Sequence, residues 1–300
     1  MTAPALRTTH DSVYATVSYA DVFDMPIELD HLHRYLVGSS LSLIETSMVV
    51  DDLVTAGKLQ RRDDVVYLAG RHEVLAIYDE RTQRAASMWK HAEKWGQRIG
   101  RIPLVRMVAV TGGLAVDSVA DHDDIDFFIV TRPRRLWLTR LMIIVLGRLA
   151  ARKDIDLCPN FLVTTRAVEM TDQTLYAARE LAQMIVIVND ELCQQVRRSN
   201  AWMFDFLPNA TVEGDRSHLS DVTPTRAQKW AEWFLLLPPF KLVETWERKR
   251  KIAKLTKVAS RRPEVGAPDE SSFSAEICKG HMVGNAAGID VAWKQRLTRQ

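Results

Sequence analysis

Two apolar runs that frame a glycine pair and a pair of aspartates are the most constraining feature of this chain. The first run, residues 104–110, leads into Gly112-Gly113; after ten intervening residues, Asp124-Ile125-Asp126 opens the second run. Residues two apart on a strand point to the same face, so Asp124 and Asp126 are expected to present their carboxylates together. The pattern therefore predicts two strands, a tight turn between them and two acids on a rigid support.

These residue types suit phosphate chemistry. Paired carboxylates bind a hard divalent cation such as Mg²⁺. Gly112 and Gly113 allow backbone N–H groups to approach a phosphate without obstruction by Cβ, and Thr111 adds a hydroxyl beside them. A metal next to a phosphate cradle is typical of phosphoryl or nucleotidyl transfer. Taken singly, either element has a simpler reading, as a solvated strand end or as an ordinary turn.

The combined pattern resembles the signature of the DNA polymerase β superfamily of nucleotidyltransferases, in its minimal bacterial or archaeal type. The resemblance covers roughly residues 105–165. It implies that Asp124 and Asp126 hold two Mg²⁺ ions, with Mn²⁺ as a possible substitute, and that a nucleoside triphosphate such as ATP is the substrate. In this family a nucleoside monophosphate passes to an acceptor hydroxyl and pyrophosphate leaves.

The family's third metal-binding acid lies on a neighbouring strand. Asp156, just before the apolar run 157–164, is the best candidate for the catalytic and metal set, and Asp154 is the next. The interior of that run carries no acid, which departs from many active members. A second departure is Gly113, where many relatives have serine.

Cations are needed for the triphosphate. Arg135 and Arg140 follow the second strand, and Arg140 interrupts an otherwise apolar helix predicted over 136–151. Because arginine makes bidentate contacts with phosphate, these two are the predicted cofactor-binding cations, alongside Thr111, Gly112 and Gly113. The alternative is that they pair with acids at a domain surface.

The N-terminal segment, residues 1–70, has helical periodicity followed by a predicted hairpin over 58–68, and resembles a winged helix–turn–helix. Its presumed recognition helix, residues 42–56, carries three acids and neither lysine nor arginine. A helix in the major groove needs cations and donors, so DNA binding is not expected. Protein contact or substrate positioning is the preferred role.

The fold class expected from these segments is α+β or mixed α/β, with a small polymerase-β-type sheet flanked by helices. The winged-helix-like module lies at the N-terminus and a helical region at the C-terminus. The predicted boundaries are 1–70 for the module, 71–100 for a linker helix and 101–172 for the nucleotidyltransferase core. A helical domain follows over 173–260, and a polar tail with a terminal helix over 261–300.

Composition narrows the setting. An apolar fraction of 47% with a charged fraction of 26% is ordinary for a globular protein, and a net charge of +2 does not suggest a polyanion binder. Three widely spaced cysteines fit a reducing cytoplasm, and no transmembrane segment is expected. One segment, residues 241–262, is strongly basic with an apolar side. It suits RNA, an anionic membrane surface, or packing against the acidic core.

The sequence thus predicts a cytoplasmic, magnesium-dependent nucleotidyltransferase. The acceptor stays open among small molecules, proteins and RNA. The alternative is a catalytically degenerate protein of the same fold that regulates by binding nucleic acid or protein.

Overall fold

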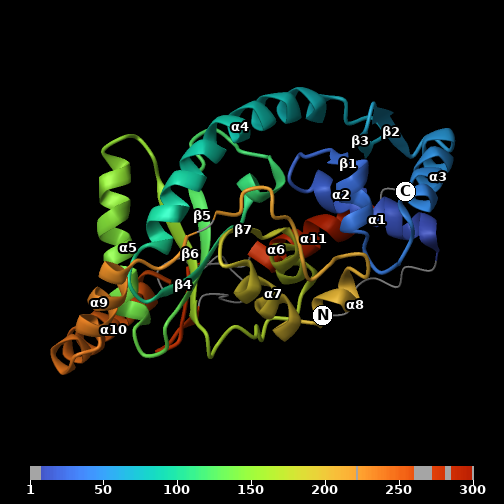
Figure 1. Ribbon diagram of the computed structural model, residues 1–300. Helices are drawn as coiled ribbons and strands as arrows, with labels where there is room; N and C mark the ends of the chain where they lie inside the picture. The colour runs from blue at the N-terminus through green and yellow to red at the C-terminus, as the bar shows by residue number, and fades with distance from the viewer. Residues whose placement is uncertain (1–7, 221, 260–271, 281–284, 299–300) are drawn as a thin grey trace.

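The computed structural model describes residues 8–220, 222–259, 272–280 and 285–298 and has a mixed α and β architecture (Figure 1). In the part of the chain that it describes, no helix combines the length and the apolar character needed to cross a bilayer.

The N-terminal segment folds into three helices and a small antiparallel sheet, which confirms the predicted helices followed by a hairpin. The elements are α1 (Thr9–Asp21), β1 (Ile27–Glu28), α2 (Leu29–Arg34), α3 (Leu43–Thr55), β2 (Leu59–Arg62) and β3 (Val65–Leu68). Capping boxes begin the two longer helices, with Thr8 and Asp11 on α1 and Ser42 and Glu45 on α3. The strands pair in the order β1-β3-β2.

The helix α4 (Glu73–Gly100) is 28 residues long and leads from this segment to the central sheet, as Figure 1 shows. It confirms the long helix predicted over 71–100. Its buried side chains, which include Trp89 and Ile99, recur on one face, and this amphipathic pattern explains why a largely polar segment packs along the sheet.

The central sheet has six strands in the order β7-β4-β5-β6-β9-β8. The predicted strands are confirmed as β4 (Val105–Val110), β5 (Ile125–Thr131) and β6 (Leu157–Thr164). β5 runs antiparallel to β4 and parallel to β6. The parallel pair needs a crossover, and α5 (Leu136–Ala151) supplies it over the predicted residues.

Residues 173–206, the first part of the predicted helical domain of 173–260, contain a strand. They form α6 (Leu175–Gln183), β7 (Ile185–Val188), α7 (Asp190–Ser199) and α8 (Met203–Phe206). The prediction that this region is entirely helical was therefore wrong. The run Ile-Val-Ile-Val is β-branched and buried at all four positions, and it pairs with β4 at the edge of the sheet. The tail contributes β8 (Ser272–Phe273) and β9 (Ile277–Lys279), so the sheet extends beyond 101–172.

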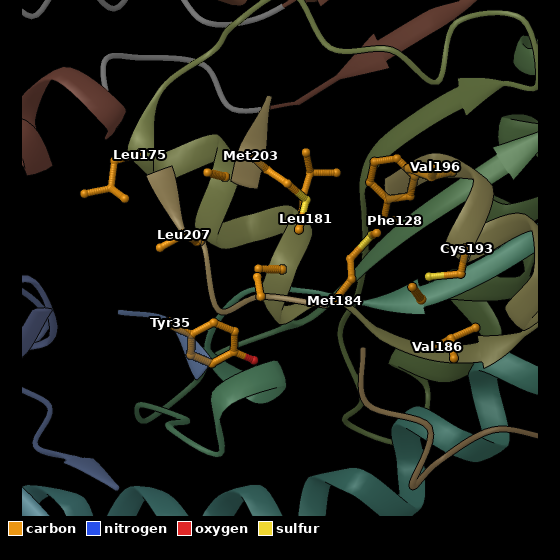
Figure 2. Close-up of a cluster of buried hydrophobic side chains, with 14 of the residues drawn as sticks. Tyr35, Phe128, Leu175, Leu181, Met184, Val186, Cys193, Val196, Met203 and Leu207 are labelled. Atoms are coloured by element: carbon orange, nitrogen blue, oxygen red, sulfur yellow. The ribbon is translucent and has the colours of Figure 1, made fainter. Parts of the chain in front are cut away.

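Alternation along the strands creates two cores. Phe127 and Ile129 of β5 face a cluster with α4 and α5, whereas Phe128 and Val130 face a cluster with α6, α7 and α8. Figure 2 shows the second cluster, where Phe128 lies among Leu181 of α6, Met184 and Val186 of β7. The face that carries Phe128 is also the face to which Asp126 belongs by the two-residue repeat.

Three further helices complete the chain: α9 (Arg226–Leu235), α10 (Pro238–Ala259) and α11 (Asn285–Leu297). Pro238 and Pro239 separate α9 from α10 by opening the latter, where a missing N–H costs little. The predicted terminal helix is confirmed as α11, which packs on α1: Trp293 Nε1 donates to the Ala15 carbonyl at 2.8 Å.

Candidate active site

The two aspartates lie where β5 begins, and the structure brings them together. Asp124 precedes the strand and is exposed; Asp126 is half-buried within it. In the parallel pairing of β5 with β6, Asp126 lies opposite Cys158. Potential ligand atoms of Asp124, Asp126 and Cys158 all lie within 4.8 Å of one another. Two carboxylates and a thiol thus form one compact donor set.

The glycine turn is built against this set. Gly112 has φ of +69°, and a Cβ on it would lie 2.6 Å from Oδ2 of Asp126. The neighbouring Thr111 N–H donates to the Asp126 carbonyl at 3.0 Å. Any side chain at position 112 would therefore both strain the backbone and displace the carboxylate. The turn and the acid form one structural unit.

Many members of the resembled family carry serine at the position of Gly113. In this chain a steric clash explains why the position is glycine. A Cβ on Gly113 would lie 2.4 Å from the backbone carbonyl oxygen of Ser118. That carbonyl is held in place because it belongs to the tight loop after the short 3₁₀ helix Gly113–Val116, where Ser118 N–H donates to the Gly113 carbonyl. Serine does not fit this loop.

The electrostatics of the set favour a cation. Burial and the charge of Asp124 raise the pKa of Asp126 from 3.8 to about 7. Burial and the charges of both aspartates raise the pKa of the Cys158 thiol, so in the metal-free protein the sulfur keeps its proton. A divalent ion would compensate the repulsion between the carboxylates and lower both pKa values.

The predicted third acid is not part of this set. The group found among the described residues does not include Asp156, whose side chain is exposed and whose backbone carbonyl accepts a bond from Ile125 N–H at 2.9 Å. Asp154 is exposed in the turn after α5, with φ of +56°. Cys158 stands at the position expected of a third ligand. The carboxylate pattern does not predict a thiol ligand. The position of Cys158 on the strand next to the two aspartates, within the 157–164 run, was the signal that could have indicated it.

The structure does not bring Arg135 and Arg140 to the aspartates. The Arg135 guanidinium donates to the carbonyls of Leu235 and Leu236 at the end of α9, at 3.3 and 3.1 Å. Arg140 lies near Cys278, which belongs to the core on the opposite face of the sheet from Asp126. Arg135 therefore packs α9 against the start of α5, and Arg140 faces β9, so neither belongs to the candidate site.

A cavity of about 420 Å³ opens on the Asp126 face of the sheet, between β5, β6, α6 and α11. Its lining is mainly apolar and aromatic, with polar groups that include Thr111, Asn160, Glu180 and Lys279. An apolar cavity with a few polar groups is the usual form of a small-molecule site. Thr111 connects this cavity to the aspartates through its bond to Asp126.

Glu180 is the functional candidate that the sequence pattern did not single out. Burial and the charge of Asp126 raise its pKa to about 7. Lys279, which lowers that pKa, is paired with Asp172 at 2.9 Å. Two carboxyl groups with pKa values near neutrality, Asp126 and Glu180, therefore face the same region. The local hint was an acid next to Leu181 and Ala182, two apolar residues that α6 buries.

Comparisons with protein-family models, with curated proteins and with solved structures gave no match for this chain.

Proposed function

We propose that this protein is a magnesium-dependent nucleotidyltransferase with a core of the polymerase β type and a winged-helix-like module at its N-terminus. The observation that carries the proposal is the contact between the glycine turn and the acid: position 112 has no room for a Cβ because the Asp126 carboxylate occupies that space. A solvated strand end next to an ordinary turn would not need such a fit.

The donor set suits a divalent ion. Asp124 and Asp126 supply hard oxygen ligands, and Cys158 adds a sulfur that binds once its proton is lost. When bound, Mg²⁺ or Mn²⁺ would hold the triphosphate oxygens and neutralise charge as the phosphoryl bond breaks. The sulfur favours softer ions such as Mn²⁺ over Mg²⁺ more than a third carboxylate would.

The residues of the chain would position the acceptor and remove its proton. The acceptor oxygen forms a bond to the α-phosphorus while the bond from that phosphorus to the pyrophosphate oxygen breaks. Glu180 takes the hydroxyl proton, because a carboxylate whose pKa lies near 7 combines a populated basic form with useful basicity at neutral pH. The apolar cavity beside it would exclude water and hold a ring of the nucleotide or of the acceptor.

Calorimetric titration of the four nucleoside triphosphates, with and without Mg²⁺ or Mn²⁺, tests the proposal. We expect metal-dependent binding to the wild type that Asp124→Ala and Asp126→Ala abolish without unfolding the protein. Asp154→Ala is the matched control, since it removes an exposed aspartate outside the donor set. Equal affinity in wild type and Asp126→Ala would contradict the assignment.

A second function, that of a catalytically inactive binding protein, is favoured by one observation. A cysteine stands where the resembled enzymes place an acid, which weakens a two-ion site. The module would then act through α3, which exposes Ile44 and Met48 and carries no cation. Such a face suits a protein partner better than DNA. Absence of triphosphate binding with either metal would favour this function.

A further inference from the structure

The helices α9 and α10 form a hairpin at the end of the molecule far from α1–α3, beside α5 (Figure 1). The five large apolar side chains on its outer surface are between 54% and 74% exposed: Trp230, Trp233, Phe234, Leu242 and Trp246. Monomeric proteins seldom expose so many large apolar groups together. This concentration of aromatic residues is the feature to be explained.

The exposed apolar residues lie on the outward faces of both helices. Trp230, Trp233 and Phe234 are spaced three and four residues apart and so share one face of α9. Phe234 contacts Phe240 at 5.0 Å between ring centroids, which joins that face to the start of α10. On α10, Leu242 and Trp246 lie one helical turn apart, on the side turned away from the buried Glu244.

The acidic side chains of the hairpin face the body of the protein, and many of its basic side chains are exposed. Its three acids between residues 226 and 257 all turn inward. Glu232 pairs with Arg106 and Arg132, Glu244 accepts bonds from the first N–H groups of α5, and Glu247 is 1% exposed beside Arg250. The exposed charges are cationic and include Arg226, Lys229, Lys241, Lys249, Arg250 and Lys254.

We propose that the outer surface of the α9–α10 hairpin docks on an anionic membrane surface. Tryptophan and phenylalanine with leucine, rimmed by lysine and arginine, are the composition of helices that lie in the bilayer interface. The cations complement acidic headgroups, and the inward acids leave no exposed negative charge on the hairpin to oppose them. Leu242 offers no ring for stacking on bases, which favours lipid over RNA. The inference is independent of the proposed transfer reaction.

Flotation of the full-length protein with vesicles tests this inference, with phosphatidylcholine alone compared with a mixture containing phosphatidylglycerol. We expect binding to the anionic vesicles and little to the neutral ones. The double variant Trp233→Ser with Leu242→Ser should bind roughly tenfold more weakly or worse. Lys249→Glu with Lys254→Glu should weaken binding to a similar extent.

The matched control is Ile44→Ser with Met48→Ser on α3, because these side chains are about as exposed as the two they match. Ile44 and Leu242 are both 74% exposed, and Met48 and Trp233 are 62% and 60% exposed. The control should bind like the wild type. Circular dichroism establishes that each variant folds.

Three results would overturn the inference. The first is absence of wild-type binding to anionic vesicles. The second is loss of binding in the charge variant alone, which would indicate a general polyanion site such as one for RNA. The third is a wild-type dimer that the Trp233 and Leu242 substitutions convert to a monomer, since a second copy would then cover the surface.

Discussion

Replacing Asp126 by asparagine should stabilise the metal-free protein, although it removes a residue on which the proposed function depends. Asparagine resembles the protonated aspartate in shape and carries no charge. In the folded protein the pKa of Asp126 is raised from 3.8 to about 7 by burial and by the charge of Asp124. Folding therefore works against the ionised form, and the neutral variant escapes that penalty.

The sign and the size follow from the two pKa values. Above pH 4 the unfolded chain loses this proton while the folded protein keeps it until about pH 7, so the carboxyl group lowers the stability of the wild type progressively over that window and fully above it. A rise from 3.8 to about 7 corresponds to roughly 4 kcal/mol, and partial solvent exposure reduces this to about 2–3 kcal/mol. Removing the charge also lowers the pKa of Glu180, which adds in the same direction.

Urea denaturation in the presence of a chelator, at pH 5 and at pH 8, measures the effect. The advantage of Asp126→Asn over the wild type should be about 1 kcal/mol at pH 5 and reach about 2–3 kcal/mol at pH 8. Saturating Mn²⁺ should stabilise the wild type and leave the variant unchanged. A variant less stable than the wild type at pH 8, or an advantage equal at both pH values, would refute the reasoning. Asp154→Asn, outside the donor set, should show no stability advantage and should be stabilised by Mn²⁺ like the wild type.

Three further substitutions test the site. Cys158→Asp places a carboxylate opposite Asp126 and should strengthen Mg²⁺ binding by roughly tenfold, measured by calorimetry, because oxygen ligands and added negative charge favour this ion; unchanged or weaker binding would show that position 158 is not a ligand position. Gly112→Ala should cost about 1–3 kcal/mol of stability in denaturation and abolish metal binding, since the new Cβ would lie 2.6 Å from the Asp126 carboxylate; retention of full metal affinity would contradict this fit. Glu180→Gln should retain metal-dependent triphosphate binding. With a known acceptor, its turnover should fall by roughly a hundredfold or more and lose the pH dependence near 7. An unchanged pH–rate profile would exclude Glu180 as the base.

Local pattern was sufficient for the elements that carry the aspartates. Hydrophobic periodicity and the glycines and prolines that end an element are properties of neighbouring residues. They therefore predicted the strands over 104–110 and 157–164 and the helix over 136–151. The same holds for the common orientation of Asp124 and Asp126, which depends only on the two-residue repeat of a strand. The run of residues 185–188 was the exception, since a short buried strand and a helical segment look alike by period alone.

Tertiary structure decided which distant residues join the site. Cys158 enters it, and Asp156 does not, because the register between β5 and β6 sets Asp126 opposite Cys158. Arg135 and Arg140 are close to the aspartates in sequence, but Arg135 binds the end of α9 and Arg140 lies beside Cys278 of β9. Glu180 arrives from a helix far along the chain. The sequence by itself determined the strand, the turn and the two acids; register and packing between distant segments decided the rest, because neither is encoded in local spacing.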